Sequence, residues 1–262
     1  MNDKIAARIK RGQVPQQDNE RFSALSTAEL LVLLHDTDAQ KRTSAARILG
    51  KRKSAEAIPV LCERLKLETA LYTRIAISEA LGAVGEPALG GLIELLGQVG
   101  GNQQQTLPLR GFYKKSYPLP RDIAARTMIK IGRPALPLLA QVVRQGERGR
   151  ALEAIDGVGH ISFYTHGPGC EGVLMSAYEK YAADEVMQWK IVRAFQAFAG
   201  AGVQRLLAAV ICSHDCAALR WEAARSLGQL GVSVPAEVLD CALQDHDGEV
   251  RHMARLFLSD RK

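Results

Sequence analysis

The chain has 262 residues, of which 47% are apolar and only 5% aromatic, and its formal net charge is +6. It contains no uncharged apolar stretch of 18 residues and no apolar signal-peptide core at its start, and its cysteine count, five, is odd. These properties exclude a membrane span and a disulfide framework, so we expect a cytoplasmic protein without a membrane partner.

The start of the chain is basic and then rich in glutamine, for which we expect a flexible lead-in over residues 1–25. Ser26 followed by Glu29 is a capping-box pattern and predicts the start of a helix. We predict that this helix caps the N-terminal end of a continuous array, which forms a single domain over residues 26–262.

A recurring pattern defines the array. An arginine followed at fixed offsets by leucine and glycine occurs at Arg42, Arg74 and Arg220, and a weaker copy begins at Arg251. The first two copies are 32 residues apart, and a period of this length predicts stacked helix pairs, each too small to bury its own apolar face. We expect these four arginines to brace neighbouring repeats.

The pattern Arg-x-x-Ala-Ala-x-x-Leu-Gly-x-x-Gly, followed by Pro-Ala-Leu and a second helix, resembles HEAT repeats, and among these the short bacterial subtype of phycobilisome lyases. The resemblance covers roughly residues 36–262 and implies an all-α fold, a right-handed α-α superhelix (HEAT-like solenoid). Such repeats mostly serve as binding scaffolds. HEAT-like relatives include an iron-dependent hydroxylase with His-Glu ligand pairs, but none of the six histidines here precedes a glutamate.

Two intervals between copies are too long, and the excess predicts inserted loops at about 97–120 and 160–172. Insertions in solenoids lie on one face, often the binding face. The resemblance implies that the second helices of the repeats line this face, with the insertions at its rim. Aromatic residues mixed with cations carry much of the energy in protein interfaces. The predicted partner-binding residues are Phe112, Tyr113, Lys114, Lys115, Tyr117, Arg121, His160, Tyr164 and His166.

A non-catalytic scaffold with a protein or peptide partner is therefore the favoured function. Nucleic-acid binding is an alternative, because cations could hold phosphates while aromatic rings stack on bases. Its predicted contacts, beyond the cations already named, are Lys41, Arg47, Lys51, Arg52, Lys53 and Arg110. Chromophore or cofactor handling, as in the lyase relatives, is a further alternative that rests on the resemblance alone.

Residues able to support metal or covalent chemistry occur in two places. Cys212, His214 and Cys216 could ligate zinc, but no second ligand pair accompanies them, so we favour buried thiols. His160, His166 and Cys170 could form a cluster, but no nucleophile lies in an activating context. We therefore expect no metal, no cofactor and no catalysis.

Overall fold

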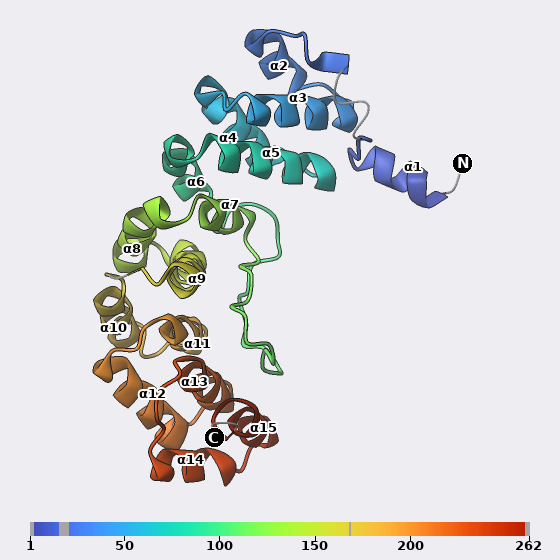
Figure 1. Cartoon of the computed structure of the whole chain (residues 1–262). Coiled ribbons are helices and arrows are strands. Elements are labelled where there is room, and N and C mark those ends of the chain that lie inside the picture. Colours follow the sequence, from blue (N-terminus) through green and yellow to red (C-terminus); the bar gives the residue numbers. More distant parts are fainter. Residues whose placement is uncertain (1–2, 16–20, 168, 260–262) are drawn as a thin grey trace. The chain divides into compact units, whose positions relative to one another are not determined.

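A computed structural model describes residues 3–15, 21–167 and 169–259 (Figure 1). Within these ranges every regular element is a helix and none is a strand, so the predicted all-α fold of HEAT-like repeats is confirmed. The chain divides into two compact units, which are treated separately below. Unit 1 comprises Met1–Gly101 and Asp122–Ala135, and unit 2 comprises Asn102–Arg121 and Leu136–Lys262.

Unit 1 contains the N-terminal repeats. Its α-helices are α1 (Asp3–Lys10), α2 (Thr27–Leu33), α3 (Ala39–Lys51), α4 (Ile58–Leu67), α5 (Leu71–Val84), α6 (Leu89–Leu95) and α7 (Ile123–Ile131). The predicted capping box opens α2: the Glu29 backbone N–H donates to Ser26 Oγ at 3.3 Å, and the Ser26 N–H donates to Glu29 Oε2 at 2.7 Å. These bonds satisfy backbone donors that the first turn of a helix leaves without partners.

The first helices of successive repeats, α3, α5 and α7, pack closely in unit 1. A Cβ atom on Gly50 would lie only 2.8 Å from the Ala80 Cα, so this crossing of α3 and α5 needs glycine. Buried hydroxyl pairs also join these helices. Thr43 and Thr73 lie 2.9 Å apart between α3 and α5, and Ser78 and Thr127 lie 2.6 Å apart between α5 and α7. Small and hydroxyl-bearing residues therefore set the spacing of the layers.

Part of the expected flexible lead-in is in contact with α3 and α5 of the same unit. The Arg11 carbonyl accepts from the Tyr72 N–H at 3.0 Å, and the Gln13 carbonyl accepts from Gln40 Nε2 at 2.6 Å. Val14 is buried. Residues 16–20 lie outside the described part of the chain. The expected flexibility of residues 1–25 and the single domain over 26–262 stay predictions.

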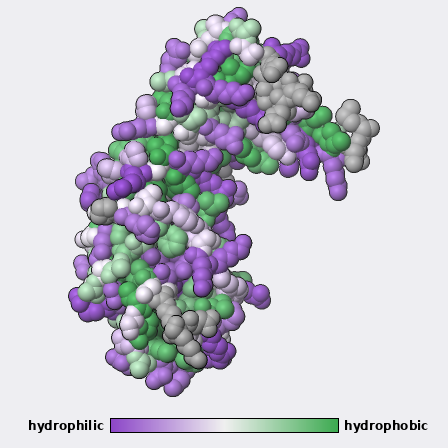
Figure 2. Space-filling model, in the orientation of Figure 1, coloured by the Kyte–Doolittle hydropathy of each residue, from purple (hydrophilic) through white to green (hydrophobic). Residues whose placement is uncertain are grey.

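Unit 2 contains the remaining repeats and the first insertion. Its α-helices are α8 (Leu136–Gln145), α9 (Arg148–Thr165), α10 (Glu171–Lys180), α11 (Glu185–Ala194), α12 (Ala201–Ser213), α13 (Ala217–Gln229), α14 (Ala236–Leu243) and α15 (Gly248–Phe257). The first helices of the repeats, α9, α11, α13 and α15, form one series, along which the insertion runs as an extended segment (Figure 1). Figure 2 shows hydrophilic and hydrophobic side chains interspersed over the visible face of each unit.

The two predicted insertions have different outcomes. No helix occurs between Leu95 and Ile123, and the chain there is irregular over the range predicted for the first insertion. The second prediction was wrong for residues 160–165, because α9 continues to Thr165 and the link to α10 covers only residues 166–170. The added turns of α9 pack their aromatic side chains against the first insertion, and this contact supports a longer helix instead of a loop.

Candidate functional site

The first insertion is fixed to α13 by one buried arginine. The Arg225 side chain is completely buried, and its Nε donates to the Phe112 carbonyl at 2.8 Å. Its Nη2 donates to the carbonyls of Lys114 at 3.2 Å and Ser116 at 2.8 Å. A guanidinium group presents several donors in a rigid fork, which suits it to hold three carbonyls of one loop. Residues 112–116 are therefore held in a set conformation.

Helix α15 provides a second attachment for the insertion. Glu249 Oε1 accepts from the Gly111 N–H at 2.7 Å and from the Tyr113 hydroxyl at 2.6 Å. The Tyr113 ring also contacts His252 edge-on, with the ring centroids 5.0 Å apart. On α13, Gln229 donates to the Lys115 carbonyl. The insertion thus contacts first helices, and the expectation that it borders a face of second helices was wrong.

Tyr117 is a core residue of unit 2. Its side chain is 3% exposed and packs against His160 and Phe163 of α9, with the ring centroids 5.7 Å apart in both pairs. A Cβ atom on Gly159 would lie 2.0 Å from the Tyr117 hydroxyl, so this contact requires glycine in α9. Burial raises the pKa of Tyr117 above its ordinary range. The prediction that Tyr117 binds a partner was wrong, because its side chain is covered.

The second predicted cluster lies beside Tyr117. His160 is half-buried, and burial lowers its pKa while the charge of Asp156 acts in the opposite direction. The Tyr164 hydroxyl accepts from the Tyr117 N–H at 3.2 Å, although 52% of Tyr164 is exposed. His166 is exposed at the end of α9, in a left-handed conformation with φ 48°. The structure therefore brings His160 and Tyr164 to the base of the first insertion.

The other predicted residues of the insertion form its outward surface. Tyr113, Lys114, Lys115 and Arg121 are exposed, whereas Phe112 is half-buried beside the Arg225 guanidinium. The sequence reasoning missed two further residues of this surface, both of them leucines, with exposures of 98% and 61%. Each follows a proline in the sequence, which was a signal that it lies in a loop. These are Leu109 and Leu119. Residues 102–121 contain four cations and no acid, so this surface is basic and partly apolar.

Beneath the insertion, charged residues are buried between the first helices. Each of three helices contributes two of them, three positions apart: Glu153 and Asp156 on α9, Lys190 and Arg193 on α11, and Glu222 and Arg225 on α13. Lys190 Nζ lies 3.0 Å from Glu153 Oε1 and from Asp156 Oδ2, and Arg193 Nη2 lies 2.8 Å from Asp156 Oδ1. We call these six residues the buried ion cluster. Its formal charges balance, as burial of charge requires.

The cluster shifts the ionisation of its members. Burial alone would raise the pKa of Asp156, but the charges and hydrogen bonds of Arg193 and Lys190 lower it below its ordinary value. Burial would lower the pKa of Arg193, but the charge of Asp156, together with that of Glu222 and a hydrogen bond to Asp156, raises it. Both residues therefore stay charged at neutral pH.

A chamber of about 190 Å³ lies between part of the insertion and the helices α9, α11 and α13. Its lining combines residues of the insertion, among them Arg110, Phe112 and Arg121, with Asp156, Trp189, Arg193, Trp221 and Glu222 of the helices. Three buried polar atoms of this lining have no hydrogen-bond partner: Trp189 Nε1, Arg193 Nε and Glu222 Oε2. These three atoms have almost no accessible surface, so they lie behind the wall of the chamber and do not face its open volume.

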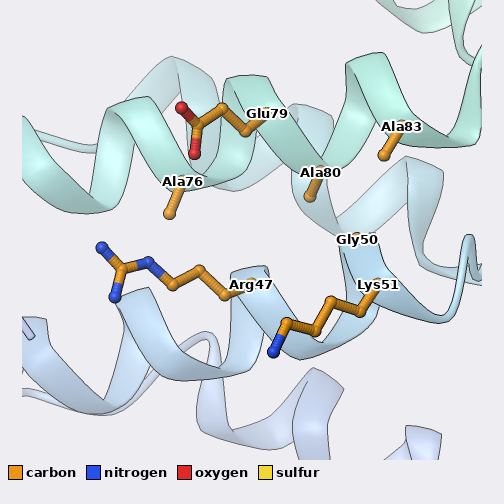
Figure 3. Close-up of a pocket in the computed structure, with 7 residues that line it drawn as sticks. All are labelled: Arg47, Gly50, Lys51, Ala76, Glu79, Ala80 and Ala83. Atoms are coloured by element: carbon orange, nitrogen blue, oxygen red, sulfur yellow. The ribbon is translucent and has the colours of Figure 1, made fainter. Parts of the chain in front are cut away.

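Unit 1 has a separate open groove of about 480 Å³ on α3 and α5 (Figure 3). Arg47 and Lys51 extend from α3 and Glu79 from α5, over a floor of small residues. The floor consists of Gly50, Ala76, Ala80 and Ala83. Of the six additional nucleic-acid contacts predicted above, only Arg47 and Lys51 meet here.

Other members of that basic set have different surroundings. Lys41 Nζ pairs with Asp36 at 2.9 Å. Arg52 Nη2 donates to the carbonyls of Ser23 and Leu25, both at 2.8 Å. Lys53 is exposed after the end of α3, and Arg110 belongs to the insertion in unit 2.

The repeated arginines do brace neighbouring repeats, as predicted. Arg42 binds both carboxylate oxygens of Glu68, at 2.8 and 2.9 Å, while Arg74 Nε donates to the Glu68 carbonyl at 3.0 Å. At the other end, Arg220 binds both oxygens of Asp245, at 2.7 and 2.9 Å, and Arg251 Nη1 donates to the Asp245 carbonyl at 2.6 Å. One acid thus connects the arginines of two successive repeats.

The Cys-Ser-His-Asp-Cys segment covers the end of α12 and the start of α13. His214 Nδ1 accepts from the Cys216 N–H at 3.0 Å. Cys212 and Cys241 are exposed, so the expectation of buried thiols was wrong for both, whereas Cys62 and Cys170 are buried. Partial burial and a hydrogen bond with the Cys241 thiol raise the pKa of Cys212 to about 12. Among the described residues, no three His, Cys, Asp or Glu side chains are grouped to hold a metal ion.

None of the described helices is both long enough and apolar enough to span a membrane. A comparison with curated proteins gives no match.

Several solved structures are similar to the chain. An engineered protein is 20% identical with a TM-score of 0.40, and the alignment covers 98% of this chain and 74% of that one. Human deoxyhypusine hydroxylase is 17% identical, with 98% and 94% covered and a TM-score of 0.38. The complex of CpcE and CpcF of phycocyanin lyase from Nostoc sp. PCC7120 is 20% identical, with 94% and 96% covered and a TM-score of 0.36. In a comparison with family profiles, residues 27–106 match HEAT repeats, which confirms the predicted repeat type for this part of the chain.

Proposed function

We propose that this protein is a non-catalytic scaffold that binds an acidic segment of a partner protein on the outward surface of the insertion at residues 102–121. One observation carries the proposal. The insertion is held from beneath by Arg225 and Glu249, and its outward surface has four cations, exposed apolar side chains and no acid. HEAT repeats commonly mediate protein interactions, which agrees with this function.

The physical chemistry of the outward surface favours a protein ligand. Leu109, Tyr113 and Leu119 are each exposed on one short ordered segment, where their apolar surface is available to a protein partner. The insertion is already ordered by its hydrogen bonds, so binding costs little loop entropy. The cations Lys114 and Lys115 select an acidic partner and speed its encounter.

The same surface is less suited to nucleic acid. Base stacking needs exposed rings, but Tyr117 is buried and Phe112 is half-buried against a guanidinium group. Tyr113 is exposed, but it is a single ring whose hydroxyl is held by the acid Glu249. In unit 1, Lys41 is paired with an acid and Arg52 with backbone carbonyls. Chromophore handling has no supporting observation of its own and stays a hypothesis.

The test is affinity capture from native lysate on the immobilised full chain, with and without nuclease. We expect a discrete acidic protein that survives nuclease and is lost when Lys114→Glu and Lys115→Glu are combined. The matched control is Lys66→Glu with Lys130→Glu, which makes the same charge change at exposed helix positions. Recovery of nucleic acid, or capture that the insertion variant leaves unchanged, would overturn the proposal. Subsequent titration of the purified partner measures the affinity directly.

A further inference from the structure

Two exposed cysteines are neighbours at the ends of α12 and α14. Cys212 lies in the last turn of α12 and Cys241 in the last turn of α14, and these two helices pack against each other in unit 2 (Figure 1). A hydrogen bond joins the two thiol groups. Both residues are exposed, whereas Cys62 and Cys170 are buried. An oxidant in solution therefore has access to a pair of thiols that already interact.

The arginine brace of the C-terminal repeats holds the two helix ends together. Directly after α12, the carbonyls of His214 and Asp215 accept from Arg220 Nη1, both at 2.8 Å. Shortly after α14, the carboxylate of Asp245 accepts from the same guanidinium at 2.7 and 2.9 Å. The side chains of Arg220 and Asp245 are each only 5% exposed, so this ion pair is shielded from solvent. The two turns that carry the cysteines are thus kept close by contacts other than the thiols.

The contact suits a disulfide, and the hydrogen bond gives the two sulfur atoms different roles. A disulfide requires the sulfur atoms to approach to about 2.05 Å, which side-chain rotation allows when the thiols are already neighbours. Partial burial and the hydrogen bond with Cys241 raise the pKa of Cys212, so the Cys212 thiol keeps its proton and donates it to the Cys241 sulfur. The acceptor sulfur is the one that carries a thiolate. Cys241 is therefore the attacking sulfur, and Cys212 resolves the product.

We propose that Cys212 and Cys241 form a reversible disulfide in response to an oxidant of the peroxide class. With hydrogen peroxide, the Cys241 thiolate attacks one oxygen, the O–O bond breaks, and the leaving hydroxide takes up a proton to become water. Cys241 is then a sulfenic acid. The Cys212 sulfur attacks the Cys241 sulfur, the S–O bond breaks, and the departing hydroxide leaves as water with the Cys212 proton. The two thiols lose two electrons, which the peroxide gains.

The disulfide connects the second helices of two successive repeats and encloses α13 between them. Arg225 of α13 holds the insertion, so the crosslink strengthens the part of unit 2 on which the insertion rests. A crosslink of this kind stabilises the fold by restricting the unfolded chain. The redox site does not depend on the acidic partner of the outward surface, so either proposal can fail without the other.

Peroxide titration of the reduced full chain tests the proposal. Hydrogen peroxide is added near neutral pH, free thiols are blocked with iodoacetamide, and mass spectrometry identifies linked peptides. We expect one intramolecular link, between Cys212 and Cys241, that dithiothreitol reverses. Fragmentation distinguishes Cys212 from Cys216, which lies in the same segment. A link through another cysteine, a link between two chains, or no link at all would overturn the proposal.

Single serine variants separate the roles of the two sulfur atoms. Cys212→Ser removes the resolving thiol, so the Cys241 sulfenic acid should accumulate and react with dimedone. Cys241→Ser removes the attacking sulfur, and labelling at Cys212 should be at least tenfold weaker. Cys216→Ser, at the N-cap of α13, is the matched control and should form the link as the parent chain does. Equal labelling of the first two variants would overturn the assignment of Cys241 as the attacking sulfur.

Thermal melting followed by tryptophan fluorescence measures the effect on unit 2, which contains both tryptophans. We expect peroxide to raise the melting temperature of the parent chain by roughly 5–10 °C. Cys212→Ser and Cys241→Ser should not show this rise, and their reduced forms should melt near the reduced parent chain, because both thiols are exposed. A disulfide that forms without raising the melting temperature would overturn its stabilising role.

Discussion

Single residues decide how the insertion meets α9. Gly159 accommodates the Tyr117 ring, and the Tyr117 hydroxyl is buried without a hydrogen-bond partner. A buried hydroxyl without a partner lowers stability, whereas the ring that carries it fills space in the core. The position of the ring is thus maintained by packing alone.

A double-mutant cycle at this contact tests the account. Gly159→Ala is expected to destabilise the protein by about 1–3 kcal/mol, because the new methyl group overlaps the hydroxyl and the ring. Tyr117→Phe alone is expected to be neutral or to stabilise the protein by up to about 1–3 kcal/mol, because it removes a buried hydroxyl without a partner, and it should reduce the cost of Gly159→Ala. Urea unfolding measures each variant. Gly149→Ala, also on α9 but with nothing within 4 Å, is the control and is expected to be neutral or stabilising. Additive effects at 117 and 159 would contradict the contact.

At the scale of elements, the insertion is an extended segment without internal regular structure, ordered by side chains from α9, α13 and α15. Arg225 contributes more of these bonds than any other residue named here, since it donates to three carbonyls. Lysine has the same charge but lacks the planar fork, so it cannot reproduce all three bonds. The conformation of the insertion therefore depends on a guanidinium group at this position.

Arg225→Lys is expected to loosen the insertion without removing the positive charge beside Glu222. Hydrogen exchange of the amides at residues 111–117 should become roughly tenfold to a hundredfold faster, because one or two net hydrogen bonds are lost. Mass spectrometry of peptides from this segment measures the change. Arg205→Lys, the same substitution at an exposed position of α12, serves as the control. Unchanged exchange in the Arg225 variant would show that the other contacts suffice.

The sequence predicts local features of these elements better than their meeting points. The capping box at Ser26 and the spacing of Arg42 and Arg74 follow from periodicity, because each depends on residues close in the chain. Arg225 and its acceptor Phe112 are 113 residues apart, and no local pattern reveals such a pair. Tyr117 is a similar case. An aromatic residue among cations in a loop is typical of a binding site, and only its contacts with α9 show that it is buried.

At the scale of the whole molecule, both units contain an acid that braces the arginines of two successive repeats. Glu68 connects Arg42 and Arg74 in unit 1, and Asp245 connects Arg220 and Arg251 in unit 2. Burial would raise the pKa of Glu68, but hydrogen bonds from Arg42, the Ala70 N–H and Arg64 lower it to about 2. The pKa of Asp245 is also lowered, despite its burial, by hydrogen bonds that include one from Arg220. Nearest-neighbour braces of this kind stabilise a repeat array locally.

The chain offers a direct way to observe the two units separately, because both of its tryptophans, Trp189 and Trp221, lie in unit 2. Tryptophan fluorescence therefore reports unfolding of unit 2, while circular dichroism reports all helices. We expect Glu68→Gln to cost about 3 kcal/mol at pH 7, since it leaves a buried arginine without its charged partner. The loss should appear in the urea transition followed by circular dichroism and leave the fluorescence transition in place.

The pH dependence of the stability lost in Glu68→Gln tests the role of the Glu68 carboxylate. A carboxyl group whose pKa is lowered on folding stabilises the folded state above its unfolded value, about 4.5, and this contribution is lost as the pH falls towards 2. The difference between the parent chain and Glu68→Gln should therefore be full at pH 7 and shrink between pH 4.5 and 2. Asp245→Asn is the reciprocal variant and should shift the fluorescence transition instead. If both variants moved both transitions equally, the two units would unfold as one cooperative body, and the local action of the braces would be refuted.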